Sequence, residues 1–600
     1  MCRGQLLPGV KRVVKRADNG LLDLGTAEFL AGRHPCRDVE FVGVAVALIR
    51  LTSTVTFQYN TRMSMLSNRS RTAFFAAAAA VVLLVLLWSA DCAAMLYKPS
   101  VGRFKDGFVL WHQDQFHLFS MYKTGGDDNN FRNVWLATSK DGVHWKDVGP
   151  VIKDAPFNIW AMAVHRVGDR FIMNHGSFTK PGVQNVIRFW ESKDLLHWTF
   201  MGNQSDLLPD TRWYPADSRL DCMSVVPVVE GDKTRYYGYA TGPGGFLESD
   251  DGIRWSGKPP PKIDWGVFPP PPTLKDEGIL EIGGCQRIGD RFYLVGGWFN
   301  YMGYTGYGVF TLVAQSPSGP FIADSAAYRL CGNSTRWVAL WARFCPRKED
   351  VLVNGYMYSG YSYETGETWL PPLKRAVVDP KGHLRLGYWK GNDVLRGAFA
   401  NVEFSKCRKV HPDDQNGDCR VIANGHRLEL QAQPEQNSLL RLHVPRTVAV
   451  LEDKINCSQG IVVEGTIRAT CRDRRLVAPA AGFYLEEKEG EGTAILLQSQ
   501  GRTDIGRLTL GDRGAFRSED VIGPGCAAPA GVVPHQDHTF RLFVRKNMFE
   551  LYLDDLLVQT FNTTHDPSTA GHIPQRIGFI AENGQAMFEN VKIAPMTLSD

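Results

Sequence analysis

The sequence predicts an all-β chain, a five-bladed β-propeller followed by a C-terminal β-sandwich. Three observations support this prediction. A short phrase recurs along the first two thirds of the chain, five hairpin patterns accompany it, and the residues after Gly397 form short alternating segments that lack the phrase. No stretch between residues 100 and 395 has a long helical period. At 600 residues the chain is several times a usual domain length, so two or more domains are expected.

The N-terminal part is predicted to be a leader. Residues 1–72 hold 11 Lys/Arg and 5 Asp/Glu, and residues 73–90 are uncharged and apolar. The second segment, extended to residues 73–94, is typical of a secretory signal peptide cleaved after about Ala94. A start at Met63 or Met65 would place it at the N-terminus and leave residues 1–62 untranslated. The alternative is an uncleaved signal anchor, which would make the chain a type II single-pass membrane protein.

Both interpretations place the rest of the chain outside the cell or in the endomembrane lumen. Sequons for N-glycosylation fit this placement. In an oxidising compartment, cysteines that are close in sequence are candidate disulfides, and Cys222 with Cys285 is a further candidate pair. The four sequons begin at Asn203, Asn333, Asn456 and Asn562, and the close cysteine pairs are Cys331/Cys345, Cys407/Cys419 and Cys457/Cys471.

The recurring phrase indicates propeller blades. Its Ser positions are 53, 57 and 67 residues apart, which is the scale of one blade. Two unrelated β-sandwiches are the alternative, but they would not repeat the phrase. Its Trp residues, Trp145, Trp198 and Trp255, are expected to be structural. The copies are ATSKDGVHW at 137–145, WESKDLLHW at 190–198, LESDDGIRW at 247–255 and the fainter AQSPSGPF at 314–321.

Five hairpins of apolar or alternating residues are predicted, most of them with Gly-Asp at the centre as a turn signal. They define a propeller domain over residues 95–397. The segments after it predict an antiparallel β-sandwich over residues 398–600, packed against the propeller. The hairpins span residues 108–122, 162–176, 223–240, 285–297 and 340–357.

Charge and cysteine spacing exclude several functions. The chain carries a formal charge of +4, and because residues 1–72 contribute +6, the remainder sums to −2. A nucleic-acid partner requires a basic face on the folded part, so none is expected. No CxxC, HExxH or Cys/His cluster at zinc spacing occurs, so neither a metal nor another cofactor is predicted.

Three acidic residues stand where a propeller would bring them together. Asp106, Asp221 and Glu281 each precede or begin the first strand of a predicted hairpin. The innermost strands of all blades surround the central channel, so residues at their starts converge in space. Three carboxyl groups supply what glycosidic cleavage needs: a nucleophile or base, an acid for the leaving oxygen, and a group that holds sugar hydroxyls. Each residue alone could instead be an ordinary turn carboxylate.

With these residues in place, the chain from about 95 to 600 resembles glycoside hydrolase family 32, the invertase, inulinase and levanase family, and the related family 43. The resemblance implies a nucleophile or base on blade one, a stabilising Asp on blade three and an acid Glu on blade four. Asp106, Asp221 and Glu281 match that order, at separations of 115 and 60 residues. The hairpin-like segment 538–555 resembles the penultimate hairpin of the family's C-terminal sandwich. The segment 368–389 resembles the family's entry to blade five.

The local motifs depart from the family pattern. Only the Asp and Gly of Trp-x-Asn-Asp-Pro-Asn-Gly remain around Asp106, Arg-Asp-Pro becomes Arg219-Leu220-Asp221-Cys222, and Glu-Cys-Pro becomes Glu281-Ile282-Gly283-Gly284. Arg219 is predicted to orient Asp221 and to bond sugar hydroxyls. Aromatic rings near the strand ends are candidate sugar platforms, although most of them are expected to belong to the propeller core. The candidates are Trp111, Trp160, Trp213, Trp298 and Trp341, with Tyr301, Tyr304 and Tyr307 in one loop.

The predicted function is hydrolysis of O-glycosidic bonds in a fructoside-like furanoside oligo- or polysaccharide. The partner is therefore a carbohydrate, and a membrane is involved only if residues 73–90 remain as an anchor. Three alternatives stay open. They are a non-catalytic carbohydrate-binding propeller, an inverting arabinosidase or xylosidase of the family 43 type, and a scaffold for protein partners.

Overall fold

The computed structural model describes residues 97–597, so the predicted leader, Cys92, Asn333 and Cys471 lie outside the described residues. No helix within the described part is long and apolar enough to cross a membrane. The residues within this range that are not described are 125–130, 181–182, 243–244, 271–280, 300, 302–306, 332–341, 359–367, 411–416, 435–443, 471–477, 512–514, 524, 530 and 564–571.

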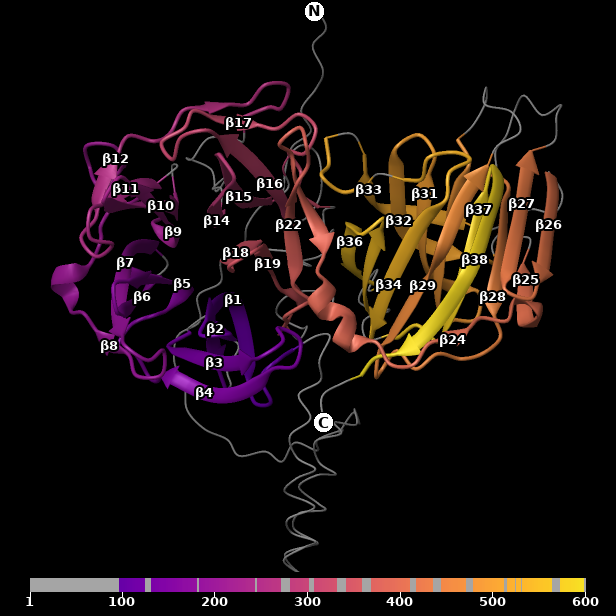
Figure 1. Cartoon of the computed structure of the whole chain (residues 1–600), viewed down its shortest axis with the longest axis horizontal. Helices are drawn as coiled ribbons and strands as arrows, with labels where there is room; N and C mark the ends of the chain where they lie inside the picture. The colour runs from indigo at the N-terminus through magenta and orange to yellow at the C-terminus, as the bar shows by residue number, and fades with distance from the viewer. Residues whose placement is uncertain are drawn as a thin grey trace, which may run out of the picture. The chain divides into compact units, whose positions relative to one another are not determined.

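The described chain is all-β, apart from short 3-10 turns, and begins with a propeller whose first four blades are separate sheets (Figure 1). Each blade is built of consecutive antiparallel strands, and β13 adds to the fourth in parallel. The predicted hairpins form the first two strands of each blade. Blade one contains β1 (Arg103–His112), β2 (Gln115–Lys123), β3 (Asn133–Ser139) and β4 (Lys146–Ile152); blade two contains β5 (Trp160–Val167), β6 (Arg170–Lys180), β7 (Val183–Ser192) and β8 (Thr199–Phe200). Blade three contains β9 (Asp221–Glu230), β10 (Lys233–Thr241), β11 (Gly245–Ser249) and β12 (Ser256–Lys258); blade four contains β14 (Glu281–Ile288), β15 (Arg291–Phe299), β16 (Tyr307–Ala314), β17 (Phe321–Ala323) and β13 (Ile263–Asp264).

The fifth predicted blade differs from the other four. Four of its strands form an antiparallel meander, but the meander continues through β36 into the C-terminal region as part of a twelve-stranded sheet. The propeller is therefore confirmed with four separate blades, and a fifth separate sheet is not. The meander strands are β18 (Arg343–Pro346), β19 (Val351–Asn354), β22 (Lys374–Val378) and β23 (Leu384–Tyr388), and the short strands β20 (Met357–Tyr358) and β21 (Thr368–Trp369) pair beside them.

The first strands of these units contact one another in turn. β1 contacts β5, β5 contacts β9, β9 contacts β14, β14 contacts β18, and β18 contacts β1. The starts of β1, β9 and β14, which carry the three predicted acids, therefore belong to one ring of neighbouring strands.

The recurring phrase forms the same turn in different blades, which agrees with the prediction that the phrase has a structural role. In blade one, Gly142 N–H donates to Ser139 Oγ at 2.8 Å, and Asp141 Oδ1 accepts from the His144 N–H at 2.8 Å. In blade three, Gly252 N–H donates to Ser249 Oγ at the same distance. Such side-chain bonds replace the backbone partners that the chain loses as it leaves the strand.

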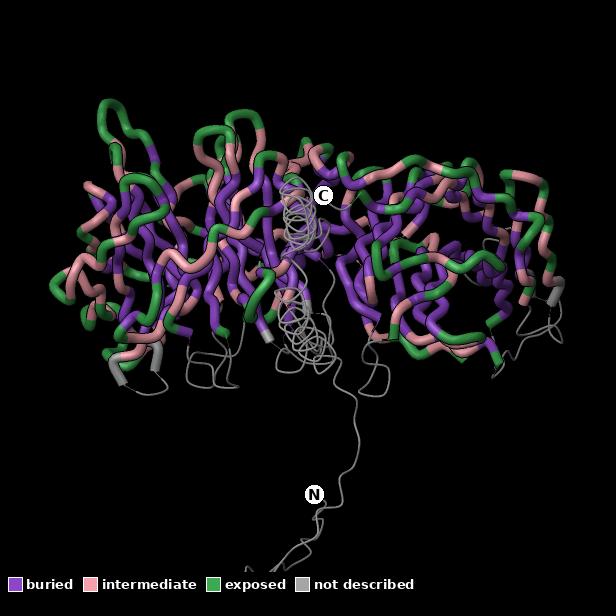
Figure 2. The backbone as a smooth tube through the Cα atoms, turned by 90° about the horizontal axis from the view of Figure 1, so that it is seen from below, coloured by how far each residue is buried: buried purple, intermediate pink, exposed green. Residues whose placement is uncertain are grey.

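The C-terminal region is a sandwich of two antiparallel sheets. Aromatic contacts join them across a shared apolar core, with Phe483 4.8 Å from Phe540 and Phe579 4.8 Å from Phe588 between ring centroids. Figure 2 shows buried residues along the strands and exposed residues in the connections. One sheet contains β25 (Cys407–Val410), β28 (Arg446–Leu451), β37 (Arg576–Glu582), β30 (Ala480–Lys488), β31 (Glu491–Gln498), β32 (Arg502–Thr509) and β33 (Ala515–Ile522). The other continues the meander with β36 (Leu556–Asn562), β35 (Met548–Leu553), β34 (His538–Arg545), β29 (Ile461–Thr470), β38 (Gly584–Pro595), β27 (Arg427–Pro434), β26 (Gly417–Asn424) and β24 (Ala400–Asn401).

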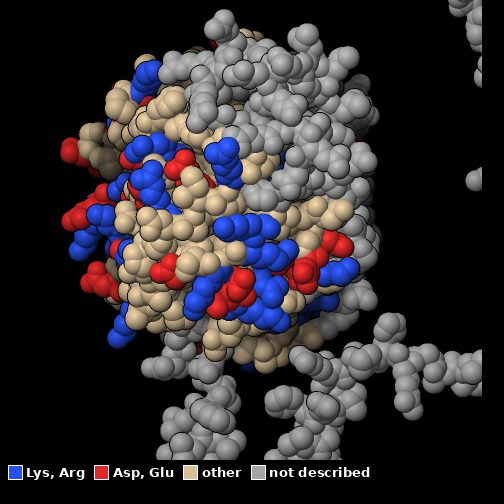
Figure 3. Space-filling model, turned by 90° about the vertical axis from the view of Figure 1, so that its right-hand side faces the viewer, with Lys and Arg blue, Asp and Glu red and all other residues tan. Residues whose placement is uncertain are grey.

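Charges of both signs are mixed on the side of β26 and β27, where Figure 3 shows Lys and Arg interspersed with Asp and Glu. Arg427 on β27, for example, lies 3.3 Å from Glu589 on β38. Charges of both signs thus alternate among the described residues of this face.

The structure corrects three of the four predicted cysteine pairs, because Cys222, Cys285, Cys331, Cys345 and Cys407 are free thiols. The pair Cys457/Cys471 is not tested, since Cys471 lies outside the described residues. Cys407 and Cys419 lie on strands of different sheets, so closeness in sequence did not make them partners. The sequons also differ from one another, because Asn203 and Asn456 are exposed whereas Asn562 is buried.

Candidate active site

The three predicted acids lie at the starts of three inner strands. Asp106 is the fourth residue of β1, and Asp221 and Glu281 are the first residues of β9 and β14. Asp106 and Asp221 are buried, while the Glu281 side chain is 24% exposed. Burial raises the pKa of Asp106, and the charges of Glu281 and Asp221 add to that rise. The fold thus brings together three carboxyl groups from distant parts of the sequence.

Backbone bulges aim these side chains. The pairing of β1 with β2 shifts register between Lys105 and Phe108, and Asp106 within this bulge has a φ of 52°. Cys222, directly after Asp221, has a φ of 51°. A positive φ is uncommon for residues other than glycine, and β-bulges often redirect side chains next to active sites.

Arg219 connects two of the acids. Its Nε donates to Asp221 Oδ2 at 3.0 Å, and its Nη1 donates to Glu281 Oε1 at 2.9 Å. The planar guanidinium can serve both carboxylates at once, which fixes their relative positions. Burial raises the pKa of Asp221, and Arg219 acts against that effect. The predicted orienting contact to Asp221 is present.

Asp106 differs from its two neighbours because no donor among the described residues bonds its carboxylate. Burial raises its pKa first of all, and the positive charges of Lys105 and Arg343 oppose that rise. A carboxylate without a protein donor keeps its lone pairs for a substrate or a water molecule.

Arg343 was not predicted as part of this site. Its guanidinium is almost fully buried, and Nη2 donates to Ala161 O at 3.2 Å while Nη1 donates to Met162 O. Its charge acts on both Asp106 and Asp221. The available signal was a lone arginine in an otherwise apolar strand, since a buried cation requires partners.

Tyr307, at the start of β16, enters the site through its hydroxyl rather than as a stacking ring. It is buried, and its pKa is raised well above the usual value by burial and then by the charge of the nearby Glu281. Gly297 makes room for it, because a Cβ there would stand 1.6 Å from the Tyr307 hydroxyl oxygen.

The predicted tryptophans divide between site and core. Trp160 begins β5 beside Lys105, whose Nζ lies 5.2 Å from the ring centroid, so it belongs to this neighbourhood. Trp298 is buried in the core of blades three and four, 5.5 Å from Tyr301. Trp111 lies at the other end of β1 from Asp106, against Phe116 by the hairpin turn. Trp341 and Tyr304 lie outside the described residues.

Trp213, another of the predicted sugar platforms, remains outside the group of acids, because it is 44% exposed and stands in the connection before β9. Within the described ranges, no group of three His, Cys, Asp or Glu side chains could hold a metal ion.

Gly176 on β6 supports the position of Asp221. A Cβ at this glycine would lie 2.3 Å from the Asp221 Cβ, so Gly176→Ala must displace that carboxylate. We expect the variant to fold and to lose about 100-fold in kcat/KM on a cleaved substrate, because a shift of about 1 Å has that effect in active sites. Steady-state kinetics measure the loss in kcat/KM, and thermal unfolding verifies that the variant folds. Gly511→Ala is the control, since its added Cβ would meet no atom within 4 Å. Unchanged kinetics for Gly176→Ala would contradict this role.

Comparison with known proteins gives a match in structure only. No family profile matches the chain, and no curated protein matches it by sequence. A glycoside hydrolase family 32 β-fructofuranosidase of Bombyx mori aligns with a TM-score of 0.52 and 12% identity, covering 85% of this chain and 94% of that one. Fructan 1-exohydrolase IIa of Cichorium intybus aligns at 0.54 and 12%, covering 85% and 98%.

A third solved structure, sucrose-6-phosphate hydrolase of Lactobacillus gasseri, aligns with a TM-score of 0.54 and 12% identity, covering 85% of this chain and 93% of that one. The resemblance to glycoside hydrolase family 32 is thus confirmed for the fold, across the propeller and the C-terminal region. At this identity the likeness concerns the fold alone.

Proposed function

We propose that this protein is a glycoside hydrolase that cleaves a furanoside-containing oligo- or polysaccharide. The observation that carries the proposal is the convergence of Asp106, Asp221 and Glu281 at the starts of inner strands, with Arg219 bonded to two of them. The fold match to invertases and fructan hydrolases supports the same reaction class.

In the retaining version, Asp106 attacks the anomeric carbon and Glu281 gives its proton to the leaving oxygen as the glycosidic bond breaks. Glu281 then takes a proton from water, which displaces Asp106 from the sugar. Asp221 stabilises the oxocarbenium-like transition state through sugar hydroxyls. In the inverting version Asp106 is the base that activates water, and the two carboxyl groups stand about 6.5–9.5 Å apart rather than about 5–5.5 Å.

We also propose that the β18–β23 meander acts as the fifth blade of a catalytic domain over residues 95–397, with the sandwich over 398–600. Its antiparallel order is that of the other blades, and β18 contacts both β1 and β14. Arg343 on β18 would then complete the ring of charged groups around Asp106.

Secretion into the lumen or the extracellular space is part of the proposal, with a type II anchor as the alternative. The apolar segment 73–90 and the exposed sequons at Asn203 and Asn456 support it. N-terminal sequencing of secreted protein tests it: a mature terminus near residue 95 is expected, and an N-terminus upstream of residue 73 would contradict cleavage.

A binding protein without turnover is the second candidate. It is favoured by Arg219, which already occupies one oxygen of Asp221 and one of Glu281. The deciding experiment incubates purified residues 95–600 with sucrose, inulin, levan and arabinan and measures released sugar and binding. We expect release that Glu281→Gln abolishes. Binding without release, unaffected by Glu281→Gln, would establish the second candidate. No sugar binding at all would favour the remaining alternative, a scaffold for protein partners.

Lys105 is predicted to set the acid limb of the pH profile. Asp106 must be ionised to act, and burial raises its pKa while Lys105 opposes the rise. Lys105→Met should therefore raise that pKa further and move the acid limb of kcat/KM to higher pH. A pH series of initial rates measures the limb, with the exposed Lys140→Met as control. An unmoved or lowered limb would rule out the assignment of this limb to Asp106.

A further inference from the structure

A second polar pocket lies in the C-terminal region, apart from the three acids. It has a volume of about 490 Å³ and is lined by residues of β24, β29, β34 and β38 and of two hairpin turns. None of its lining residues belongs to the propeller strands. Small-molecule sites span roughly 300–1,000 Å³, so the pocket can hold one or a few sugar units.

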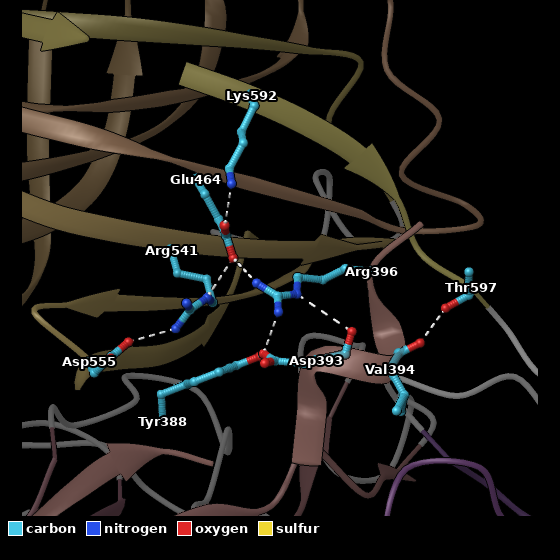
Figure 4. Close-up of polar contacts among 9 residues, drawn as sticks. All are labelled: Tyr388, Asp393, Val394, Arg396, Glu464, Arg541, Asp555, Lys592 and Thr597. Atoms are coloured by element: carbon cyan, nitrogen blue, oxygen red, sulfur yellow. Dashed lines mark hydrogen bonds and ion pairs between the residues drawn. The ribbon is translucent and has the colours of Figure 1, made fainter. Parts of the chain in front are cut away.

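Four of the lining residues, Glu464, Arg541, Asp555 and Lys592, belong to a network of ion pairs and hydrogen bonds (Figure 4). Glu464 on β29 accepts from Arg541 Nε at 2.8 Å and from Arg396 Nη1 at 2.9 Å, and Lys592 Nζ stands 3.3 Å from its other oxygen. Arg541 Nη1 also donates to Asp555 at 2.7 Å. Burial acts to raise the pKa of Glu464, but Arg541 and Arg396 outweigh it and lower that pKa.

Aromatic rings hold the cations of the network in place. The Arg541 guanidinium lies 3.7 Å from the centroid of the Tyr388 ring, and Lys592 Nζ lies 4.3 Å from that of Phe399. Side chains that are already fixed lose little conformational entropy when they bind a ligand. The network is thus suited to binding as well as to stabilising the sheet.

The chemistry of the lining points to a neutral, polyhydroxylated ligand. The charges of Arg541, Lys592 and Arg396 are balanced by those of Glu464, Asp555 and Asp393, the last of which pairs with Arg396 at 2.8 Å, so no net charge calls for an ion. Thr466 on β29 and the exposed Asn401 and Asn590 add further donors and acceptors to the lining. Closely spaced donors and acceptors of this kind match the vicinal hydroxyls of a sugar.

We propose that this pocket binds a neutral oligosaccharide of the same class as the substrate and acts as a non-catalytic holding site. The role as a holding site depends on the proposed function, but binding itself does not. A chain held on the sandwich would raise the local concentration of cleavable ends, as linked binding sites do.

The test uses the full chain with Asp106→Asn, which prevents turnover, and calorimetric titration with 1-kestose, with an arabinan oligosaccharide, and with inorganic phosphate. We expect one of the two oligosaccharides to bind in the pocket and phosphate not to bind. Adding Lys592→Met or Thr466→Val should weaken that binding event about tenfold, the effect of losing one hydrogen bond of a charged or well-placed group. The exposed Lys193→Met is the matched control.

The outcomes separate the two proposals. If the propeller also binds sugar, titration gives two sites and the pocket variants weaken only one. If the propeller binds no sugar, one site remains and the same variants weaken it; hydrolysis itself is tested separately, by sugar release from the parent chain. Sugar binding that neither variant changes, no sugar binding at all, or binding of phosphate alone would overturn the pocket proposal. Thermal unfolding of each variant verifies that it is folded.

Discussion

Asp106→Asn is expected to lower kcat at least about 1,000-fold while sugar binding persists. The amide keeps the shape of the carboxyl group but can neither attack the anomeric carbon nor accept a proton from water. Its backbone should tolerate the change, because Asp106 has a φ of 52° and asparagine is among the residues that best adopt the left-handed region. Initial rates on the substrate found by the panel, with binding measured by titration, give both quantities.

Asp114→Asn is the matched control. Asp114 lies in the turn between β1 and β2 with a φ of 56°, and it is exposed. Its substitution makes the same chemical change at a similar backbone conformation, so it should leave kcat unchanged. Activity in Asp106→Asn within tenfold of the parent would refute the role assigned to Asp106.

Asp106→Asn should also be more stable than the parent at neutral pH. The pKa of Asp106 is raised by burial, so its ionised form is less favourable in the folded chain than in the unfolded one. This cost is complete above the folded-state pKa and absent below the unfolded value of about 3.9. The stability gain should therefore shrink as the pH falls. Urea titrations across this range measure it, and a variant that is less stable at neutral pH would contradict the sign.

Lys374→Met is expected to destabilise the chain by about 3–5 kcal/mol. Lys374 on β22 and Glu550 on β35 form an ion pair whose side chains are both fully buried. Burial lowers the pKa of Lys374, and Glu550 opposes that effect. Tyr552 and Thr560 also donate to Glu550, at 2.8 and 3.0 Å, so the carboxylate is held as an acceptor. Removal of the ammonium would leave its charge buried and uncompensated.

The measurement is the free energy of unfolding from denaturant titration. Adding Glu550→Gln to Lys374→Met should restore part of the loss, because the uncompensated charge is then gone. The surface pair of Lys488 with Glu491 is the comparison, and Lys488→Met should change stability by less than about 1 kcal/mol. Equal effects of the buried and exposed lysine substitutions would contradict the argument.

Local pattern predicted much of the architecture. Alternating or apolar residues, with Gly-Asp at the turn in three cases, defined the hairpins that became β1/β2, β5/β6, β9/β10, β14/β15 and β18/β19. The spacing of the Ser-containing phrase gave the blade length, since the same local turn must recur in each blade. These features depend on neighbours within a few residues, which is why the amino-acid order alone reveals them.

Other features depend on residues far apart in the chain. Arg343 and Gly176 contribute to the site because blades pack against one another. The residues next to them in sequence do not indicate that they lie near Asp221. The predicted pair Cys407/Cys419 was wrong for the same reason, because these neighbours in sequence lie on strands of different sheets. Trp298 and Trp160 were both candidate sugar platforms, yet one is buried in the core and the other stands beside Lys105.

The sequence by itself determined an all-β chain of repeated hairpins with three acids at strand starts, because strand periodicity and turn chemistry are local. Only the tertiary structure decided that the last meander joins the sandwich sheet, that Arg219 links Asp221 to Glu281, and that Asp106 stays without a protein donor among the described residues. Those contacts arise from the packing of strands around a ring, where distances are set by the whole fold rather than by neighbouring residues.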